Sequence, residues 1–291
     1  MEIKRYVAIP APKDMVSRKG EFELAEGPFY DKRYKRFSCI DITNGTLYFN
    51  GSEGRDLVKL NQMLGAAVPV KESSAFVLAA ADGIYVADKD GVRLLYDLTK
   101  DYKAWQRSND AKCDSRGRLF IGSMSYDVGR GVGGDLYCFE NGTLRKVIEN
   151  TGLANGMAWS GDDKRFFFSD SIEHAVFVYD YDIEKGKMHN GRKLFEIKDG
   201  VSDGMCIDDE DNLWVAIWGG RRVEKRDGRS GELLEVVEVD ADNVSSCCFF
   251  GENMDTLFIT TARNGEDVDN GGRLFTCKVD ARGCDIDYAV L

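Results

Sequence analysis

The chain has only two histidines and no stretch approaching the roughly 20 apolar residues that a membrane-spanning helix needs. It also has no excess of positive charge, because 39 Lys and Arg stand against 50 Asp and Glu, giving a net charge of −11. An acidic protein repels nucleic-acid phosphates and anionic lipid, so neither nucleic acid nor membrane is expected as a partner, whereas cations are attracted. The first residues lack the apolar core of a signal peptide, so a cytoplasmic location is expected.

The eight cysteines show no Cys-x-x-Cys pair and no neighbouring histidine, so the spacing of zinc-binding or redox motifs is absent. Most of them fall inside apolar, strand-like runs such as FSCID, LYCFE and SCCFF. The sequence therefore predicts buried, reduced thiols that pack as small hydrophobic side chains, with a disulfide framework as the alternative.

Signatures of two other kinds of site are also missing. His174 and His189 lie in polar turn-like segments, and no Gly-x-Ser-x-Gly sequence accompanies them, so a serine-triad hydrolase is not indicated and both histidines are expected at the surface. The acidic tract 208–211 lacks the spacing of an EF-hand calcium loop and is expected to be a solvated turn.

Six short apolar runs of one character recur along the chain and are predicted to be strands. They are RFSCID from Arg36, AFVLAA from Ala75, RLFIGS from Arg118, RFFFSD from Arg165, NLWVAI from Asn212 and TLFITT from Thr256. The second residues of successive runs are 39, 43, 47, 47 and 44 positions apart, which is the repeat length of propeller blades.

Each run is followed by further strand candidates joined by Gly, Asn and Asp turns, so the sequence predicts an all-β, six-bladed β-propeller with a central channel. A ring of this kind avoids an exposed edge when a terminal strand completes its last blade. Either YVAIP near the start or DYAVL at the end could be this closing strand. Because linkers rich in Pro, Gly or Ser are absent, we expect a single domain over residues 1–291, with residues 1–20 as a possible closing strand.

Polar residues recur ten or eleven positions before the second residue of each apolar run, at the start of a segment that resembles an inner strand. They are Glu26, Asn109, Asn155, Asp203 and Ser246, while the second repeat has Gly65. Equivalent positions of a closed ring lie at one radius and one height, so these side chains are expected to converge on the channel.

Two interpretations of this polar ring stay open. Asn-Gly and Asp-Gly are common tight-turn dipeptides, so each position taken alone indicates a turn. The polar residues occupy the same position in successive repeats, however, and this regularity favours a binding site in the channel. Two carboxylates and an amide carbonyl are hard oxygen ligands that suit Ca²⁺, Mg²⁺ or Mn²⁺, and carboxylates brought together without a cation would repel one another.

At these residues the sequence resembles the family of regucalcin, senescence marker protein and gluconolactonase, six-bladed propellers that hydrolyse sugar lactones. The motifs that carry the likeness run from about Glu21 to about Ala262 and are AEGPFYD, RSNDAKCDSRGRLFIGSM, NGMAWSGDDKRFFFSDS, DGMCIDDEDNLWVAIWGG and SCCFFGENMDTLFITTA. The resemblance implies that Glu26, Asn155 and Asp203 hold one divalent metal ion.

The resemblance further implies that Arg107 and Asn109 contact the sugar. Being two apart on a strand, they also share a face on simple geometry. Trp105, two residues before Arg107, is a weaker substrate-site candidate. The lid segment departs from the family pattern, since Tyr126 and Asp127 stand where relatives often have an acidic residue shortly after Gly-Thr-Met. Asp127 is therefore a second weak candidate for substrate binding.

The function implied is opening of a sugar lactone to the aldonic acid, with the metal as Lewis acid and water activator and with Asp203 as catalytic base. Ca²⁺ is the first expectation for the ion, with Mg²⁺, Mn²⁺, Zn²⁺ or Fe²⁺ as alternatives. Two other functions are compatible with the same ligands: a phosphotriesterase-like hydrolase, and a non-catalytic calcium-binding or regulatory propeller. The sugar and the oligomeric state do not follow from the sequence.

Overall fold

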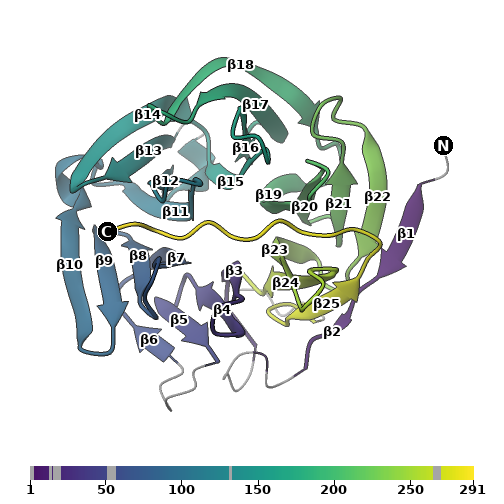
Figure 1. The fold of residues 1–291 in the computed structure, drawn as a ribbon, viewed down its shortest axis with the longest axis horizontal. Coiled ribbons are helices and arrows are strands. Elements are labelled where there is room, and N and C mark those ends of the chain that lie inside the picture. The colour runs from purple at the N-terminus through teal and green to yellow at the C-terminus, as the bar shows by residue number, and fades with distance from the viewer. Residues whose placement is uncertain (1–2, 13–14, 16–20, 51–56, 131–132, 265–269) are drawn as a thin grey trace.

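The strands of the chain form a ring of six antiparallel blades around a central axis, as the sequence predicts (Figure 1). The computed structural model describes residues 3–12, 15, 21–50, 57–130, 133–264 and 270–291. Four blades are separate four-stranded sheets, and the fifth and sixth are joined by a single pair, Trp218 with Asn243, into one nine-stranded sheet. Among the described residues no helix has the length and apolarity to cross a bilayer.

The strands follow one another from the axis to the rim in each blade. Blade 1 contains β3 (Ala25–Asp31), β4 (Arg36–Asp41), β5 (Thr46–Phe49) and β6 (Leu57–Lys59). Blade 2 contains β7 (Leu64–Pro69), β8 (Phe76–Ala80), β9 (Gly83–Asp88) and β10 (Gly91–Asp97). Blade 3 contains β11 (Gln106–Cys113), β12 (Leu119–Ser125), β13 (Gly134–Glu140) and β14 (Thr143–Thr151). Two short 3-10 helices, η1 (Leu98–Lys100) and η2 (Val128–Arg130), precede β11 and follow β12.

The second half of the ring repeats this order. Blade 4 contains β15 (Ala154–Trp159), β16 (Arg165–Asp170), β17 (Ala175–Asp182) and β18 (Lys187–Glu196). Blade 5 contains β19 (Val201–Ile207), β20 (Leu213–Trp218), β21 (Arg222–Arg226) and β22 (Leu233–Glu238). Blade 6 contains β23 (Asn243–Phe250), β24 (Thr256–Ala262) and β25 (Phe275–Lys278). All six recurrent runs of the sequence are second strands of blades.

The ring is closed by the N-terminal segment, which answers the question that the sequence leaves open. Strand β2 (Ile9–Pro10) pairs antiparallel with β25 and completes blade 6. Strand β1 (Lys4–Val7) pairs in parallel with β22 and adds a fifth strand to blade 5. Residues 1–2, 13–14 and 16–20 of the predicted closing region lie outside the described residues.

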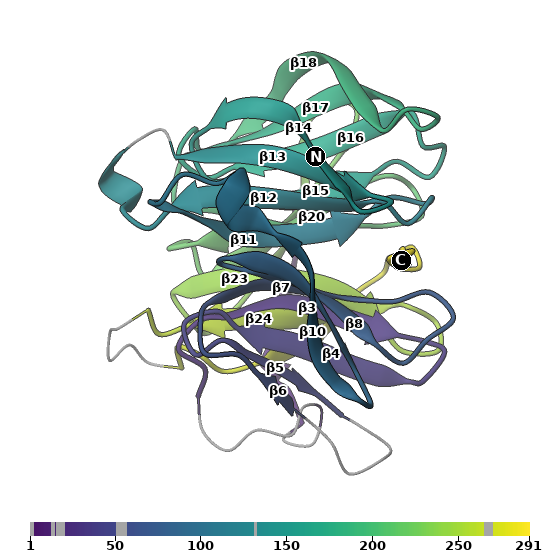
Figure 2. The same ribbon diagram turned by 90° about the vertical axis from the view of Figure 1, so that its left-hand side faces the viewer.

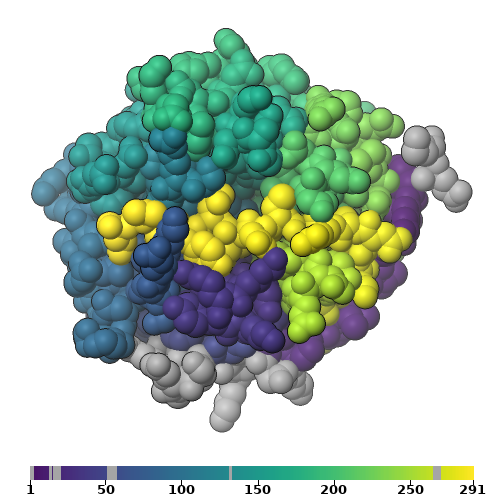
Figure 3. All heavy atoms as spheres, viewed as in Figure 1, coloured from purple at the N-terminus to yellow at the C-terminus, as the bar shows by residue number. Residues whose placement is uncertain are grey.

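The C-terminal segment crosses one face of the ring instead of joining a blade (Figures 1 and 3). We call residues 282–291 the C-terminal strap. Its backbone bonds to blade 5 through Cys284 N–H to Ile207 O, to blade 2 through Ala289 N–H to Pro69 O, and to blade 3 through Val290 N–H to Gly117 O. All three contacts lie at or beyond the ends of inner strands, so the strap covers the end of the channel opposite to the starts of these strands.

The hydrophobic core lies between neighbouring blades. Between blades 3 and 4, for example, the ring of Trp159 lies 5.2 Å from that of Phe120 and 4.9 Å from that of Phe166. Such face-to-face packing of sheets buries aromatic and branched side chains at every blade boundary. Because the apolar side chains are used between blades, the axis is left to polar groups. Figure 2 shows the stacked blades from the side.

Every inner strand is irregular at the same height. The pairing with the second strand shifts register between Glu26 and Phe29 in blade 1, and the corresponding shifts in the other blades are at Leu64/Ala66, Ser108/Ala111, Ala154/Met157, Ser202/Met205 and Val244/Ser246. A bulge bends a strand and redirects its side chains. The polar ring predicted from the sequence falls on these six irregularities.

One expectation about the acidic tract is wrong. Asp208 is buried, with its carboxylate accepting hydrogen bonds from the N–H groups of Glu210 and Asn212 and from Nε1 of Trp214. Lys225 adds an ion pair at 3.4 Å. Asp208 therefore stabilises the β19–β20 turn from its buried side. Asp209 and Glu210 are exposed as expected, whereas Asp211 is half-buried and pairs with Arg165.

The expectations for the thiols and histidines are largely confirmed. All eight cysteines are free, six are buried, and Cys206 and Cys284 are half-buried. His174 and His189 are exposed, but His189 lies on strand β18 and not in a turn as expected.

Candidate functional site

The three side chains predicted as metal ligands meet at the starts of their inner strands. Glu26 comes from β3, Asn155 from β15 and Asp203 from β19, and each is at most 7% exposed. The amide Nδ2 of Asn155 donates a hydrogen bond to Oδ1 of Asp203. The carboxyl groups of Glu26 and Asp203 interact with each other, since each shifts the pKa of the other. Three separate blades thus bring two acids and an amide together at one end of the channel. We call Glu26, Asn155 and Asp203 the ligand cluster.

The electrostatics of this cluster favour protonation when no cation is present. Burial raises the pKa of Glu26 well above its usual range, and the charges of Asp203 and Asp110 add to the rise. Burial and the charge of Asp110 likewise raise the pKa of Asp203, against the opposing hydrogen bonds from Asn155 and Glu26. These shifts favour the protonated forms of the two acids, and a bound divalent cation would replace the protons.

The donor set fits a hard divalent cation. Oδ1 of Asn155 is buried and has no hydrogen-bond partner within the described part of the chain, so an acceptor stands unused beside two carboxylates. Carbonyl and carboxylate oxygens are the ligands preferred by Ca²⁺ and Mg²⁺. In the described ranges no group of three or more His, Cys, Asp and Glu side chains is placed to hold a metal ion by itself. A cation at this point would need the amide oxygen in addition to the two carboxylates.

Ser171 orients this amide, and it was not among the site residues predicted from the sequence. Its Oγ accepts a hydrogen bond of 3.1 Å from Nδ2 of Asn155 and donates one of 2.7 Å to the carbonyl of Ser202. Nδ2 is thereby held toward Ser171 and Asp203, which leaves Oδ1 as the free acceptor.

Asp110 is an additional acid at the site that the sequence reasoning missed. It is buried on β11 next to Asn109, and its charge raises the pKa of both Glu26 and Asp203. Burial raises the pKa of Asp110 itself, and Lys112 opposes this rise. A third acid close to the ligand pair increases the attraction for a cation.

Arg107 and Asn109 form the neighbouring wall. Nη1 of Arg107 donates to Oδ1 of Asn109 at 3.1 Å and to the carbonyl of Ser108 at 2.9 Å. Nδ2 of Asn109 donates to the carbonyl of Ala154 at 3.1 Å, at the start of the strand that carries Asn155. Burial lowers the pKa of Arg107 to about 10, with the charge of Glu26 opposing the shift. Arg107 and Asn109 are therefore brought to the same end of the channel as the ligand cluster.

The interpretation of the polar ring as tight turns is wrong. Asn155-Gly156 lies within β15 and Asp203-Gly204 within β19. The glycines serve close approach instead, since a Cβ on Gly156 would lie 2.5 Å from the carbonyl oxygen of Asp203 and one on Gly204 would lie 2.1 Å from Oγ of Ser246. Ser246 is thus a packing partner of the neighbouring strand.

The two weaker candidates lie outside this cluster. The ring of Trp105 is half-buried and faces two cations, Lys103 at 5.0 Å and Arg130 at 4.6 Å. Asp127 is exposed, and its Oδ1 accepts from the N–H of Gly129 at 3.0 Å. Among the described residues no hydrogen bond or ion pair joins Asp127 to the ligand cluster, so its role in substrate binding stays a prediction.

Comparisons with known proteins agree with this architecture. The family model described as "SMP-30/Gluconolactonase/LRE-like region" matches residues 24–263. An uncharacterized protein of Sulfolobus acidocaldarius is 35% identical over 276 residues, covering 94% of this chain and 97% of its own, and regucalcin of Gallus gallus is 30% identical over 257 residues, covering 84% and 85%.

Among solved structures, a luciferin-regenerating enzyme superposes with a TM-score of 0.86 at 27% identity, covering 94% of this chain and 97% of its own. The family match spans all the inner strands and the whole ligand cluster. The chain therefore belongs to the SMP-30/gluconolactonase/LRE-like family.

Proposed function

We propose that the protein is a metal-dependent hydrolase that opens sugar lactones to aldonic acids. The observation that carries the proposal is the position of Arg107 and Asn109 beside the acid and amide cluster. A cation held only for stability has no need of a buried guanidinium nearby, whereas a polar substrate with a carbonyl needs both an ion and fixed donors. The family descriptions support the same class of reaction.

Glu26, Asn155 and Asp203 would hold the divalent cation, and Ca²⁺ suits their oxygen donors best. When bound, such an ion supplies Lewis-acid polarisation of the lactone carbonyl. Arg107 and Asn109 orient the ring hydroxyls and the carbonyl, and the planar guanidinium offers fixed donors to the oxygen on which negative charge develops.

Asp203 is proposed to be the base. Its carboxylate removes a proton from water, the resulting hydroxyl oxygen bonds to the carbonyl carbon, and the ring carbon–oxygen bond breaks as the ring oxygen gains a proton.

The test is acid release from a panel of lactones, with a buffer blank for spontaneous opening. Metal-stripped protein is compared with protein loaded with Ca²⁺, Mg²⁺, Mn²⁺ or Zn²⁺, and an organophosphate triester is included. We expect metal-dependent turnover of glucono- or xylonolactone. Turnover of the triester alone would show a phosphotriesterase, and binding of calcium without any turnover would show a non-catalytic calcium-binding propeller.

Asp203→Ala gives the residue-level test. We expect a loss of at least roughly a hundredfold in kcat/KM, because the variant lacks both a ligand and the base. Asp90→Ala removes an exposed acid from a turn of blade 2 and serves as the matched control. A fully active Asp203→Ala variant would refute the assignment.

A further inference from the structure

Two thiols of neighbouring inner strands are in contact. Sγ of Cys206 on β19 lies 3.6 Å from Sγ of Cys247 on β23, and both cysteines are free. The pair links blade 5 to blade 6 across 41 positions of sequence. Forming a disulfide, with its bond of about 2.05 Å, requires the sulfurs to move together by only about 1.5 Å.

The approach of the two strands has a cause in the sequence. Gly204 precedes Cys206 by two residues on β19, and a Cβ at position 204 would lie 2.1 Å from Oγ and 2.6 Å from Cβ of Ser246. Only a glycine lets β19 and β23 come this close. Ser246 directly precedes Cys247, so the tight contact holds the two cysteines together as well.

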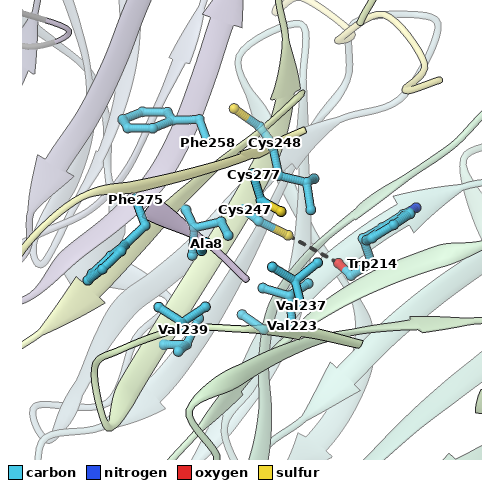
Figure 4. Packing of buried hydrophobic residues seen from close by; sticks show 14 of the residues in the cluster. Ala8, Trp214, Val223, Val237, Val239, Cys247, Cys248, Phe258, Phe275 and Cys277 are labelled. Atoms are coloured by element: carbon cyan, nitrogen blue, oxygen red, sulfur yellow. Dashed lines mark hydrogen bonds between the residues drawn. The ribbon is translucent and has the colours of Figure 1, made fainter. Parts of the chain in front are cut away.

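The sulfur atoms of Cys206 and Cys247 differ in their accessibility. Cys206 is half-buried and lines a cavity of about 230 Å³ that also contacts Lys112 and the C-terminal strap. Cys247 is 2% exposed, and its S–H donates to the carbonyl of Trp214 at 3.3 Å (Figure 4). A small reagent that enters the cavity therefore reaches Cys206 before it reaches Cys247.

The side chain of the adjacent Cys248 points in a different direction from that of Cys247. Successive side chains of a strand point to opposite faces, and in Figure 4 the sulfur of Cys248 points away from that of Cys247. Cys247 contacts Trp214 of blade 5, whereas Cys248 lines the cavity that Cys206 also lines. The geometry thus distinguishes the two neighbouring thiols.

We propose that Cys206 and Cys247 are a reversible oxidation site at which a small hydroperoxide creates a disulfide between blades 5 and 6. The sulfur of Cys206 attacks one peroxide oxygen, which gives a sulfenic acid and releases water. The sulfur of Cys247 then displaces the hydroxyl group, which leaves as a second water once protonated. Two thiols lose two electrons and two protons in all, and hydrogen peroxide is reduced to two molecules of water.

The surroundings of Cys206 make the reaction slow at neutral pH. Burial raises the pKa of its thiol, the neighbouring Cys247 and Cys248 add to the rise, and the ammonium group of Lys112 opposes it. Because the thiolate is the nucleophile, the rate is expected to increase roughly tenfold per pH unit below the thiol pKa.

The test uses the full chain, reduced and then treated with hydrogen peroxide. Remaining thiols are blocked with N-ethylmaleimide, and tryptic peptides are analysed by mass spectrometry without reduction. Peptide 199–221 contains Cys206, and peptide 230–263 contains both Cys247 and Cys248. We expect these two peptides to be linked with the loss of two hydrogens, and dithiothreitol to separate them.

Variants identify the partner. The link is expected to persist in Cys248→Ser, the matched control, and to disappear in Cys206→Ser and Cys247→Ala. Persistence in Cys247→Ala would overturn the assignment. So would wild-type protein in which Cys206 becomes sulfinic acid, or stays open to N-ethylmaleimide, without any linked peptide. This wild-type measurement decides the matter even if a variant fails to fold.

Discussion

At the scale of single residues, Glu26 and Asp203 are two buried acids that would repel each other if both were ionised, so the metal-free cluster is stabilised by protonation. The raised pKa values of Glu26 and Asp203 mean that the folded, metal-free protein binds more protons than the unfolded chain above about pH 4. Their contribution to stability is therefore complete below the unfolded pKa values and is lost as pH rises through the raised ones. A divalent cation reverses this dependence, because it binds the deprotonated acids.

We therefore predict that calcium raises the melting temperature more at about pH 8 than at about pH 5. Thermal unfolding with saturating calcium and with a chelator, at both pH values, measures the difference. Other titrating groups, such as Asp287 with its pKa raised to about 7 by burial, are present with and without calcium. An equal or smaller calcium effect at the higher pH would contradict the assignment of the ligands.

Arg107 permits a second prediction at this scale. Arg107→Lys keeps a positive charge but loses the planar donor array that contacts Asn109. We expect kcat/KM for the lactone to fall on the order of a hundredfold while calcium affinity is unchanged. Steady-state kinetics and calorimetric titration separate the two quantities. Arg93→Lys, an exposed change on β10, is the control. Equal losses of activity and of calcium binding would assign Arg107 to the cation site instead of the substrate.

Asp110 shows where sequence reasoning ends at the residue scale. In a regular strand, neighbours point to opposite faces, so Asp110 would face away from Asn109. The register shift between Ser108 and Ala111 breaks this alternation. Short-range patterns do not disclose a bulge, whereas Glu26, Asn155 and Asp203 could be found because the same polar position repeats from blade to blade.

At the scale of elements, the six second strands and the inner strands were predictable because apolar β-branched and aromatic runs recur at blade spacing. The role of the glycines was not. Asn-Gly and Asp-Gly indicate turns locally, and only the ring places Gly156 and Gly204 against the backbone or side chain of the next blade. Close packing between blades overrides the local preference.

This role predicts the effect of Gly204→Ala. The added Cβ would lie 2.1 Å from Oγ of Ser246, so β19 and β23 must separate, at a cost of about 1–3 kcal/mol in the free energy of unfolding. Chemical denaturation measures the loss. Gly161→Ala is the matched control, since the nearest atom to its Cβ would be Oδ1 of Asp211 at 3.6 Å and its φ is not positive. Equal stability of the two variants would contradict the close-approach explanation.

At the scale of the whole molecule, the two ends of the channel differ in structure. The ligand cluster lies where the inner strands start, and the C-terminal strap covers the opposite end. Lys112 lies between them, since its ammonium group acts on Asp110 on one side and on Asp287 of the strap on the other. The strap was not predictable as a cover, because DYAVL has the composition of an ordinary edge strand.

Removal of residues 284–291 is predicted to lower the melting temperature by several degrees while the proposed lactonase activity is retained. The deletion loses the backbone bonds to Ile207, Pro69 and Gly117 and uncovers the packing around Ala289. Differential scanning calorimetry and the lactone assay test both parts. Deletion of the exposed Leu291 alone is the control. Loss of activity with an unchanged melting temperature would show that the strap acts on the site.

The way in which the chain enters the ring also determines how the molecule bears mechanical load. Strand β1 holds blade 5 through parallel pairing, and β2 holds blade 6 through only two residues. Tension on the N-terminus is therefore carried first by β1 at the rim, and the short seam at β2 comes under load only after β1 has detached. The two-residue seam at β2 is thus protected by the strand that precedes it.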